Sequence, residues 1–373
     1  MNDMAAWQSA GLYVPDAPGA VHRLALLEYL AVRGATLDEL VEADRARRLP
    51  ALAGTLVRRE HRSLVSPAEL AATGVVGLDT FERIWQSAGL PAVPPDARAL
   101  TDRDAESMRS FVAAAEVFGE DALLQFTRAV GAALASIADA SMALFGLTVA
   151  GDLIEAGASE LEYARAFENG SRMLVDVVPA VMSALFQHHV DHAVDRYIAG
   201  GGDEVGAQVA YLAVGFVDLV ESTSMIESLP ADEIAAALSA FEQRATEVVA
   251  DHGGRVVKTI GDEVMFVATT AFAAAEIALA LVEFAAAHPA LRGIRGGLAW
   301  GPLVRGYGDF YGPVVNIAAR AAKEARPGEV LAELELIGQV QAATSLRIGV
   351  PKEHDLRGFT EPIVLWSIER PKP

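Results

Sequence analysis

The chain has 373 residues, enough for two or three domains with hydrophobic cores of their own, since a domain commonly takes about 100 to 200 residues. Acidic side chains number 50 and basic ones 30, and the resulting net charge of −20 repels nucleic-acid backbones, so no nucleic acid is expected as a partner. The sequence contains no cysteine, which excludes disulfides, thiolate nucleophiles and cysteine-bound metals.

The first part of the chain, residues 1–200, is expected to form a domain of helices only, arranged as a bundle with short connections. Helix starts are indicated where Thr or Ser is followed three residues later by an acidic side chain, as at Thr36, Ser66 and Thr101. Pro67, directly after one of these, is typical of the first helical position.

One segment of this helical part, residues 129–151, has about the length of a membrane span. Asp139 lies near its middle, and the surrounding Ala, Gly and Ser side chains are too small to offset the cost of inserting that carboxylate into a bilayer. We therefore predict a buried helix and no membrane span. The first residues show no basic segment followed by an apolar one, so no export signal is expected and a cytoplasmic location is predicted.

The hydrophobic period changes after residue 208, where an apolar and β-branched run indicates a buried strand. A linker over 201–208 and a second domain over 209–373 are predicted. In chain order the expected elements of this domain are a strand at 209–217, a helix at 230–251, strands at 255–260 and 263–268, a helix at 270–288, a strand at 291–301 and a helix at 313–324. Strand, helix, hairpin, helix and strand make a ferredoxin-like α+β arrangement.

Two aspartates lie where strands of this predicted sheet end or turn. Asp218 ends the first strand and Asp262 lies in the hairpin turn, so neighbouring strands would bring both to one edge. Mg²⁺ or Mn²⁺ bound to a nucleoside triphosphate needs such hard oxygen ligands, and two ions favour in-line phosphoryl chemistry. The alternative is that each Asp merely forms a turn, as Asp commonly does after Gly.

Asn316 and Arg320 are four residues apart on the last predicted helix, so they share one face. An amide and a planar guanidinium placed together could hold ribose and phosphate. The alternative is that Arg320 is simply solvated, as most arginines on short helices are.

Three motifs, FVDLVEST, KTIGDEVMF and DFYGPVVNIAAR, occur in this order between residues 209 and 370. Their sequence and spacing resemble the catalytic domain of class III nucleotidyl cyclases. The resemblance implies that Asp218 and Asp262 bind two metal ions per active site, and that Asn316 and Arg320 contact the transition state.

The same resemblance implies that Lys258 and Asp309 recognise the adenine ring. The lysine can donate to N1 of adenine and the aspartate can accept from its exocyclic amine, so ATP is favoured over GTP. Arg357 falls where the family often places a basic phosphate contact, and a surface arginine is an equal alternative. Glu221 departs from the family pattern, which usually has a small Gly-containing segment after the first Asp.

In class III cyclases the metal pair and the other site residues come from opposite sides of a subunit interface. This chain carries both sets, so a homodimer is expected to build two sites. The expected function is that of an adenylyl cyclase making cyclic AMP and pyrophosphate from ATP. The alternative is a catalytically degenerate cyclase fold that binds a nucleotide or a partner without turnover.

Two other motifs point to functions that the rest of the sequence does not support. Residues 201–205 nearly spell a diguanylate cyclase signature, but they precede the first strand instead of occupying a central hairpin, so we interpret them as linker. Residues 66–90 have the pattern of a helix-turn-helix, but the second helix offers only Arg83 and Gln86 to base edges. A plain packing pair of helices is preferred.

The helical part resembles, through its apolar pattern over residues 22–200, the regulatory domain of soluble mycobacterial adenylyl cyclases. His188, His189 and His192 lie on the helix that leads to the linker, and histidine titrates near pH ~6.5, so pH sensing is a hypothesis beside that of a merely polar helix face. A pocket lined by Ala, Leu and Phe in this domain would also permit a fatty-acid-like apolar ligand.

Overall fold

The computed structural model describes residues 3–59, 64–146, 156–199, 209–220 and 230–371, together with residues 148 and 153. The chain divides into two compact units, Met1–His188 and His189–Pro373. The predicted linker at 201–208, with its GGDEV-like run, and Glu221 lie outside the described residues.

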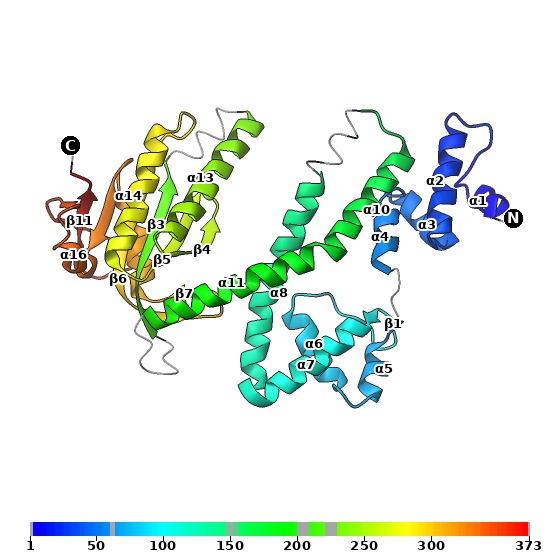
Figure 1. Ribbon diagram of the computed structural model, residues 1–373, viewed down its shortest axis with the longest axis horizontal. Helices are drawn as coiled ribbons and strands as arrows, with labels where there is room; N and C mark the ends of the chain where they lie inside the picture. Colours follow the sequence, from blue (N-terminus) through cyan, green and yellow to red (C-terminus); the bar gives the residue numbers. More distant parts are fainter. Residues whose placement is uncertain are drawn as a thin grey trace. The chain divides into compact units, whose positions relative to one another are not determined.

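The first unit is almost entirely helical (Figure 1). Its helices are α1 (Asp3–Ser9), α2 (Ala20–Val32), α3 (Leu37–Arg45), α4 (Leu52–Arg59), α5 (Pro67–Ala72), α6 (Leu78–Ser87), α7 (Asp102–Phe118), α8 (Glu120–Phe145), α10 (Glu160–Asp176) and the first part of α11 (Val178–Ala199). The expectation of helices only needs one correction, because β1 (Leu64–Val65) and β2 (Leu100–Thr101) form a short antiparallel pair. Thr101, which caps α7 with extended backbone at φ −92° and ψ 167°, ends β2, and Ser66, which caps α5, directly follows β1.

The predicted helix starts are confirmed in detail. The side chains of Thr36, Ser66 and Thr101 each accept a hydrogen bond from the backbone N–H three residues on, and the acidic side chain there accepts one from the backbone N–H of the cap residue. Each pair is a capping box, which satisfies two backbone donors that a helix start otherwise leaves open. Pro67 occupies the first turn of α5 as expected.

The apolar core of the first unit is divided into two clusters. One gathers residues of α1 to α4 around Leu26, Leu27 and Leu30, which are fully buried and repeat at helical spacing. The other gathers residues of α5 to α8 around Phe81 and Ile84. Neither cluster reaches far along the longest helices of the unit.

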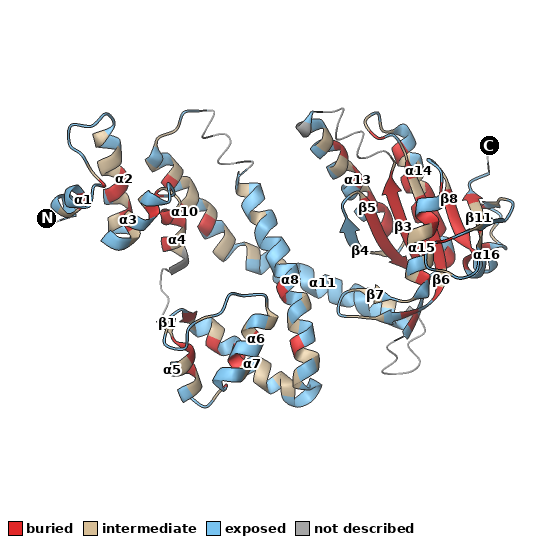
Figure 2. Cartoon of the chain, turned by 180° about the vertical axis from the view of Figure 1, so that it is seen from behind, coloured by how far each residue is buried: buried red, intermediate tan, exposed pale blue. Residues whose placement is uncertain are grey.

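The prediction that residues 129–151 form a buried helix is wrong for most of its length. Helix α8 packs through Leu124 and Gly131, whereas Leu134, Met142 and Leu144 are 46%, 54% and 61% exposed. Figure 2 shows this helix largely in the colour of exposed residues. A helix of 26 residues is about 39 Å long, so it extends beyond the small cluster that covers its start. By length and composition alone α8 and the stretch through α10 and α11 could each cross a membrane, and one or two such helices are weak evidence.

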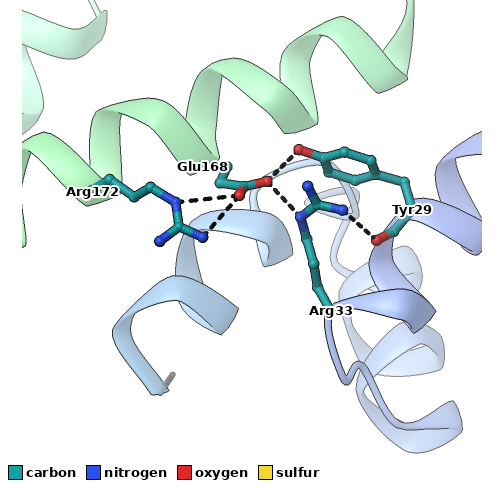
Figure 3. A network of polar contacts seen from close by, with 4 residues as sticks. All are labelled: Tyr29, Arg33, Glu168 and Arg172. Atoms are coloured by element: carbon teal, nitrogen blue, oxygen red, sulfur yellow. Dashed lines mark hydrogen bonds and ion pairs between the residues drawn. The ribbon is translucent and has the colours of Figure 1, made fainter. Parts of the chain in front are cut away.

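A polar network ties α10 to α2 (Figure 3). The buried carboxylate of Glu168 accepts hydrogen bonds from the Tyr29 hydroxyl, from Arg33 Nε at 2.5 Å and from Arg172 Nη2 at 3.1 Å. The Arg33 guanidinium also lies over the Tyr29 ring, 3.5 Å from its centroid. The first unit therefore joins these helices partly through charge and partly through apolar packing.

The second unit is built on one nine-stranded sheet of order β10-β11-β8-β6-β3-β5-β4, with β7 paired to β6 and β9 to β11. The strands are β3 (Val209–Leu219), β4 (Arg255–Ile260), β5 (Glu263–Ala268), β6 (Ile294–Arg305), β7 (Phe310–Tyr311), β8 (Val330–Glu333), β9 (Arg347–Ile348), β10 (Lys352–His354) and β11 (Ile363–Glu369). The helices are α13 (Ala231–Asp251), α14 (Ala271–Ala287), α15 (Pro313–Glu324) and α16 (Leu334–Val340).

The central four strands confirm the predicted ferredoxin-like arrangement, because β6, β3, β5 and β4 are neighbours and each pair is antiparallel. Helices α13 and α14 pack on one face of the sheet, where Phe241 and Ile277 are buried. Helix α15 packs on the other face, where Phe216 and Met265 are buried against Ala318. Every residue of β5 is buried, as expected of a strand covered on both sides.

Candidate active site

Asp218 and Asp262 lie at the same end of two neighbouring strands. Asp218 is the penultimate residue of β3, and its register partner on β5 is Glu263, the residue after Asp262. The backbone N–H of Leu219 donates to the carbonyl of Asp262 at 3.3 Å, which fixes the hairpin turn against the end of β3. Gly261 precedes Asp262 in that turn with φ +65°, a conformation that favours glycine. The structure thus brings both carboxylates to one sheet edge.

Arg295 is a site residue that the sequence did not reveal. Its Nη2 and Nε donate to Asp218 Oδ2 at 2.6 and 3.0 Å, and its Nη1 donates to the Lys323 carbonyl at 2.9 Å. It lies directly opposite Asp218 in the register of β6 with β3. One Asp218 oxygen is therefore held in place by a fork of donors that is itself tied to the end of α15.

Glu263 adds a third carboxylate at this edge. Its side chain is buried, and its Oε1 has no hydrogen-bond partner among the described residues, while Lys323 Nζ lies 4.0 Å from Oε2. Burial raises the pKa of Glu263 and the charges of Asp218 and Asp262 raise it further, while the charges of Lys323 and Arg295 offset part of this rise. Glu263 Oε1 is thus an acceptor without a donor beside two further carboxylates. Hard oxygen ligands of this kind fit a divalent cation such as Mg²⁺ or Mn²⁺, although no three metal-binding side chains among the described residues already converge on one point.

Lys258 and Asp309 form a second constellation in the same unit. Lys258 Nζ lies 2.5 Å from Asp309 Oδ2, although the two residues come from β4 and from the segment between β6 and β7. The other oxygen, Oδ1, accepts from the backbone N–H of Phe310 at 2.8 Å. Both side chains are partly exposed, so a donor and an acceptor stand next to each other where a planar ring could reach them.

Asn316 and Arg320 lie on α15, which begins at Pro313 as predicted. Asn316 is exposed, whereas Arg320 is half-buried with its guanidinium 5.1 Å from the centre of the Phe359 ring. Gly358 lies beside the same guanidinium, with φ +85°. Arg357 precedes Gly358 and is exposed, so the structure places it in the loop next to Arg320 without giving it a role.

The structure places both the helix-turn-helix pattern and the three neighbouring histidines on helices. The helix pair of residues 66–90 is present as α5 and α6, and its candidate base-reading side chains are engaged within the chain, Arg83 with Glu120 at 2.9 Å and Gln86 with Glu82 at 2.9 Å. His188, His189 and His192 are all exposed on α11, and no cluster of three metal-binding side chains is found among the described residues.

Comparison with known proteins places both units in named families. Residues 10–194 match the model of the adenylate cyclase regulatory domain, and residues 207–358 match that of the adenylate and guanylate cyclase catalytic domain. An adenylate cyclase of Streptomyces coelicolor is 30% identical, over 76% of this chain and 72% of its own length. An uncharacterized protein of Mycobacterium tuberculosis is 30% identical over 98% of this chain and 94% of its own length. A protein named pH-sensitive adenylate cyclase, also from Mycobacterium tuberculosis, is 27% identical over 93% of this chain and 88% of its own.

Proposed function

This chain belongs to the adenylate cyclase family in which a regulatory domain precedes an adenylate and guanylate cyclase catalytic domain, and from that premise we propose that it converts ATP to cyclic AMP and pyrophosphate. The observation that carries the choice of ATP is the pair of Lys258 and Asp309, whose 2.5 Å contact sets a donor beside an acceptor. Adenine offers an acceptor at N1 and a donor at its amine, so it can take both partners. Guanine offers the reverse pattern on this edge.

Asp218 and Asp262 are proposed to hold the divalent cations, with the fork of Arg295 keeping the Asp218 side chain aimed at the sheet edge. Two bound cations would lower the pKa of the ribose 3′-hydroxyl and clamp the triphosphate. Asn316 would orient the ribose, and Arg320 would donate to the oxygens of the transferring phosphorus, where negative charge accumulates. No covalent enzyme intermediate is needed.

We propose that the active form is a homodimer with two sites, as the resemblance to class III cyclases implies. Each site would combine Asp218 and Asp262 of one subunit with the partner subunit's Lys258, Asp309, Asn316 and Arg320. The two sets would then never have to meet within one chain. A cytoplasmic location accords with this function and remains an expectation.

Mixing two inactive variants tests both the sites and the shared interface. Asp262→Ala removes a metal ligand and Lys258→Ala removes a base contact, so each variant alone should lose at least about 100-fold in kcat/KM with ATP and manganese. In a mixed dimer the two lesions fall in one site and leave the other intact, so mixing should restore about a quarter of wild-type activity, since about half of the dimers are mixed and each has one good site of two.

The wild-type protein assayed with ATP and with GTP gives the control for substrate choice, and we expect ATP to be used at least about ten times more efficiently. Absence of recovery on mixing, with mixed dimers confirmed by mass, would count against the shared interface. A wild-type protein that binds ATP but turns over neither nucleotide would favour the degenerate alternative.

The regulatory proposal is that the first unit makes the activity depend on pH. Three exposed histidines on α11, the helix in which the chain passes from the first unit to the second, and the pH-sensitive relative support it. Each histidine that gains a proton would add one positive charge to that helix. Replacing His188, His189 and His192 by Gln together should flatten the pH profile of cyclase activity between about pH 5.5 and 7.5, and an unchanged profile would exclude these residues as the sensor. The fatty-acid-like ligand of this unit remains a prediction.

A further inference from the structure

A cavity in the second unit is lined by three arginines from three different elements. Asp218 and Asp262 do not line it. Its volume is about 280 Å³. Arg196 comes from the end of α11, Arg255 from the start of β4 and Arg305 from the end of β6. The end of α11 lies next to β7 (Figure 1). All three side chains are half-buried, so their charges are partly removed from water.

None of these three guanidinium groups forms an ion pair with an acidic side chain that the structure describes. Among the residues that the structure describes, no carboxylate oxygen lies within 4.0 Å of any of the three guanidinium groups. Asp309 borders the cavity, but Lys258 already lies 2.5 Å from its Oδ2. Burial lowers the pKa of Arg255 and the neighbouring charge of Arg196 lowers it further, while the charge of Asp309 offsets part of this lowering. In a chain of net charge −20, three half-buried arginines without an ion-pair partner among the described residues are unexpected.

Two of the three arginines lie over aromatic rings, and such a contact leaves the N–H groups of a guanidinium free to donate hydrogen bonds. Arg305 Cζ lies 4.4 Å from the centre of the Tyr197 ring, and Arg255 Cζ lies 5.3 Å from that of Phe310. Arg255 Nη2 also donates to the Gly308 carbonyl at 3.0 Å. Stacking engages the face of a guanidinium, whereas its five N–H donors point outward in the plane. The remaining donors are available to an acceptor inside the cavity.

We propose that this cavity binds a small molecule carrying a phosphate group, which Arg196, Arg255 and Arg305 hold together. Tetrahedral phosphate oxygens match the planar fork of arginine and supply the missing negative charge. The apolar and aromatic part of the lining, which includes Leu212 and Tyr197, suits an organic group attached to the phosphate. Free inorganic phosphate carries the same oxygens and is the other ligand that could supply them. Because Asp309 borders the cavity, occupancy would also hold the segment that carries it.

Calorimetric titration of the full-length protein tests the proposal in metal-free buffer, with inorganic phosphate and with phenyl phosphate as probes. We expect saturable binding of at least one probe. Tighter binding of phenyl phosphate would identify an organic phosphate as the ligand class, and equal or tighter binding of inorganic phosphate would identify the free anion. Arg305→Gln should weaken binding about ten-fold or more, and Arg305→Lys should lie between, since lysine keeps the charge and loses the fork.

Two controls separate this cavity from other sites. Arg244 is partly exposed on α13 and pairs with Glu247 at 3.4 Å, so Arg244→Gln should leave binding unchanged. Asp262→Asn alters the metal site and should also leave binding unchanged. Arg196→Gln serves as the second cavity variant if Arg305→Gln fails to fold. The proposal is overturned if neither probe binds saturably at concentrations on the order of 10 mM, if the cavity variants bind like wild type, or if Asp262→Asn abolishes binding.

Discussion

The two units of this chain are stabilised in different ways. In the second unit a continuous sheet is covered on both faces, and all six residues of β5 are buried. In the first unit the core is split into two clusters, α8 is exposed along most of its length, and the buried side chains include Glu168. The comparison indicates that apolar close packing stabilises the catalytic unit, whereas capping boxes and charged networks contribute a larger share in the regulatory unit.

If close packing stabilises the second unit, the largest loss of stability is expected from Gly297→Ala in β6. A Cβ on Gly297 would lie 2.1 Å from the Ala322 nitrogen and 2.2 Å from the Ala318 carbonyl oxygen. Both are backbone atoms of α15, so the helix itself must move. We expect a loss of about 3 kcal/mol or more in the unfolding free energy of the second unit, because overpacking against backbone cannot be relieved by a rotamer change. Cyclase activity should fall with it, because α15 carries Asn316 and Arg320.

Gly296→Ala is the matched control. Its Cβ would point to the other face and meet only side-chain atoms of Val330 and Val217, at 3.4 and 3.6 Å. The change should cost less than about 1 kcal/mol. Scanning calorimetry of the full-length variants measures both effects, with the first unit's transition unchanged in each. Equal effects of the two substitutions would show that α15 is not held by close packing.

The sequence predicted those elements whose signals are local. The bounds of β5 and the start of α15 agree with the prediction, because a Gly-Asp turn opens β5 and Pro313 opens α15. The burial of α8 was mispredicted because burial depends on what packs against a helix, which its own apolar pattern does not contain. The short pair of β1 and β2 was missed because two-residue strands carry no periodicity.

In the candidate site, too, the residues with a local sequence motif were predicted and those that depend on strand register were not. The sequence motifs pointed to Asp218 and Asp262, and the antiparallel register places them at one edge. Arg295 is 77 residues from Asp218, so the ion pair between them depends on the register of β6 with β3, which no motif encodes. Glu263 follows Asp262 directly in the GDEV run and could have been noticed as a further acid, but its lack of a partner is a property of the folded sheet.

A smaller effect, confined to the first unit, is expected from Glu168→Gln. The neutral amide keeps the shape but removes the charge that Arg33 and Arg172 share, and it leaves the Tyr29 hydroxyl with a weaker acceptor. We expect a loss of about 2 kcal/mol in the unfolding free energy of the first unit, since the carboxylate is buried but Arg33 and Arg172 are partly exposed and screened. Glu116→Gln on the exposed face of α7 is the control and should change stability by less than about 0.5 kcal/mol.

The pH dependence of that difference decides whether charge is the cause. Burial alone would raise the pKa of Glu168, but hydrogen bonds from Tyr29, Arg33 and Arg172 more than offset it, so the pKa lies below its usual value of 4.5. The folded unit therefore binds this proton less readily than the unfolded chain. The stabilisation is fully present above about pH 4.5 and is lost as the pH falls through the folded-state pKa. Unfolding of wild type and Glu168→Gln should thus converge as the pH is lowered from 7 toward 3. A difference in unfolding free energy that stays constant over this range would mean that the shape of the Glu168 side chain, not its charge, joins α2 and α10. The first unit would then not differ from the second in being stabilised by charge.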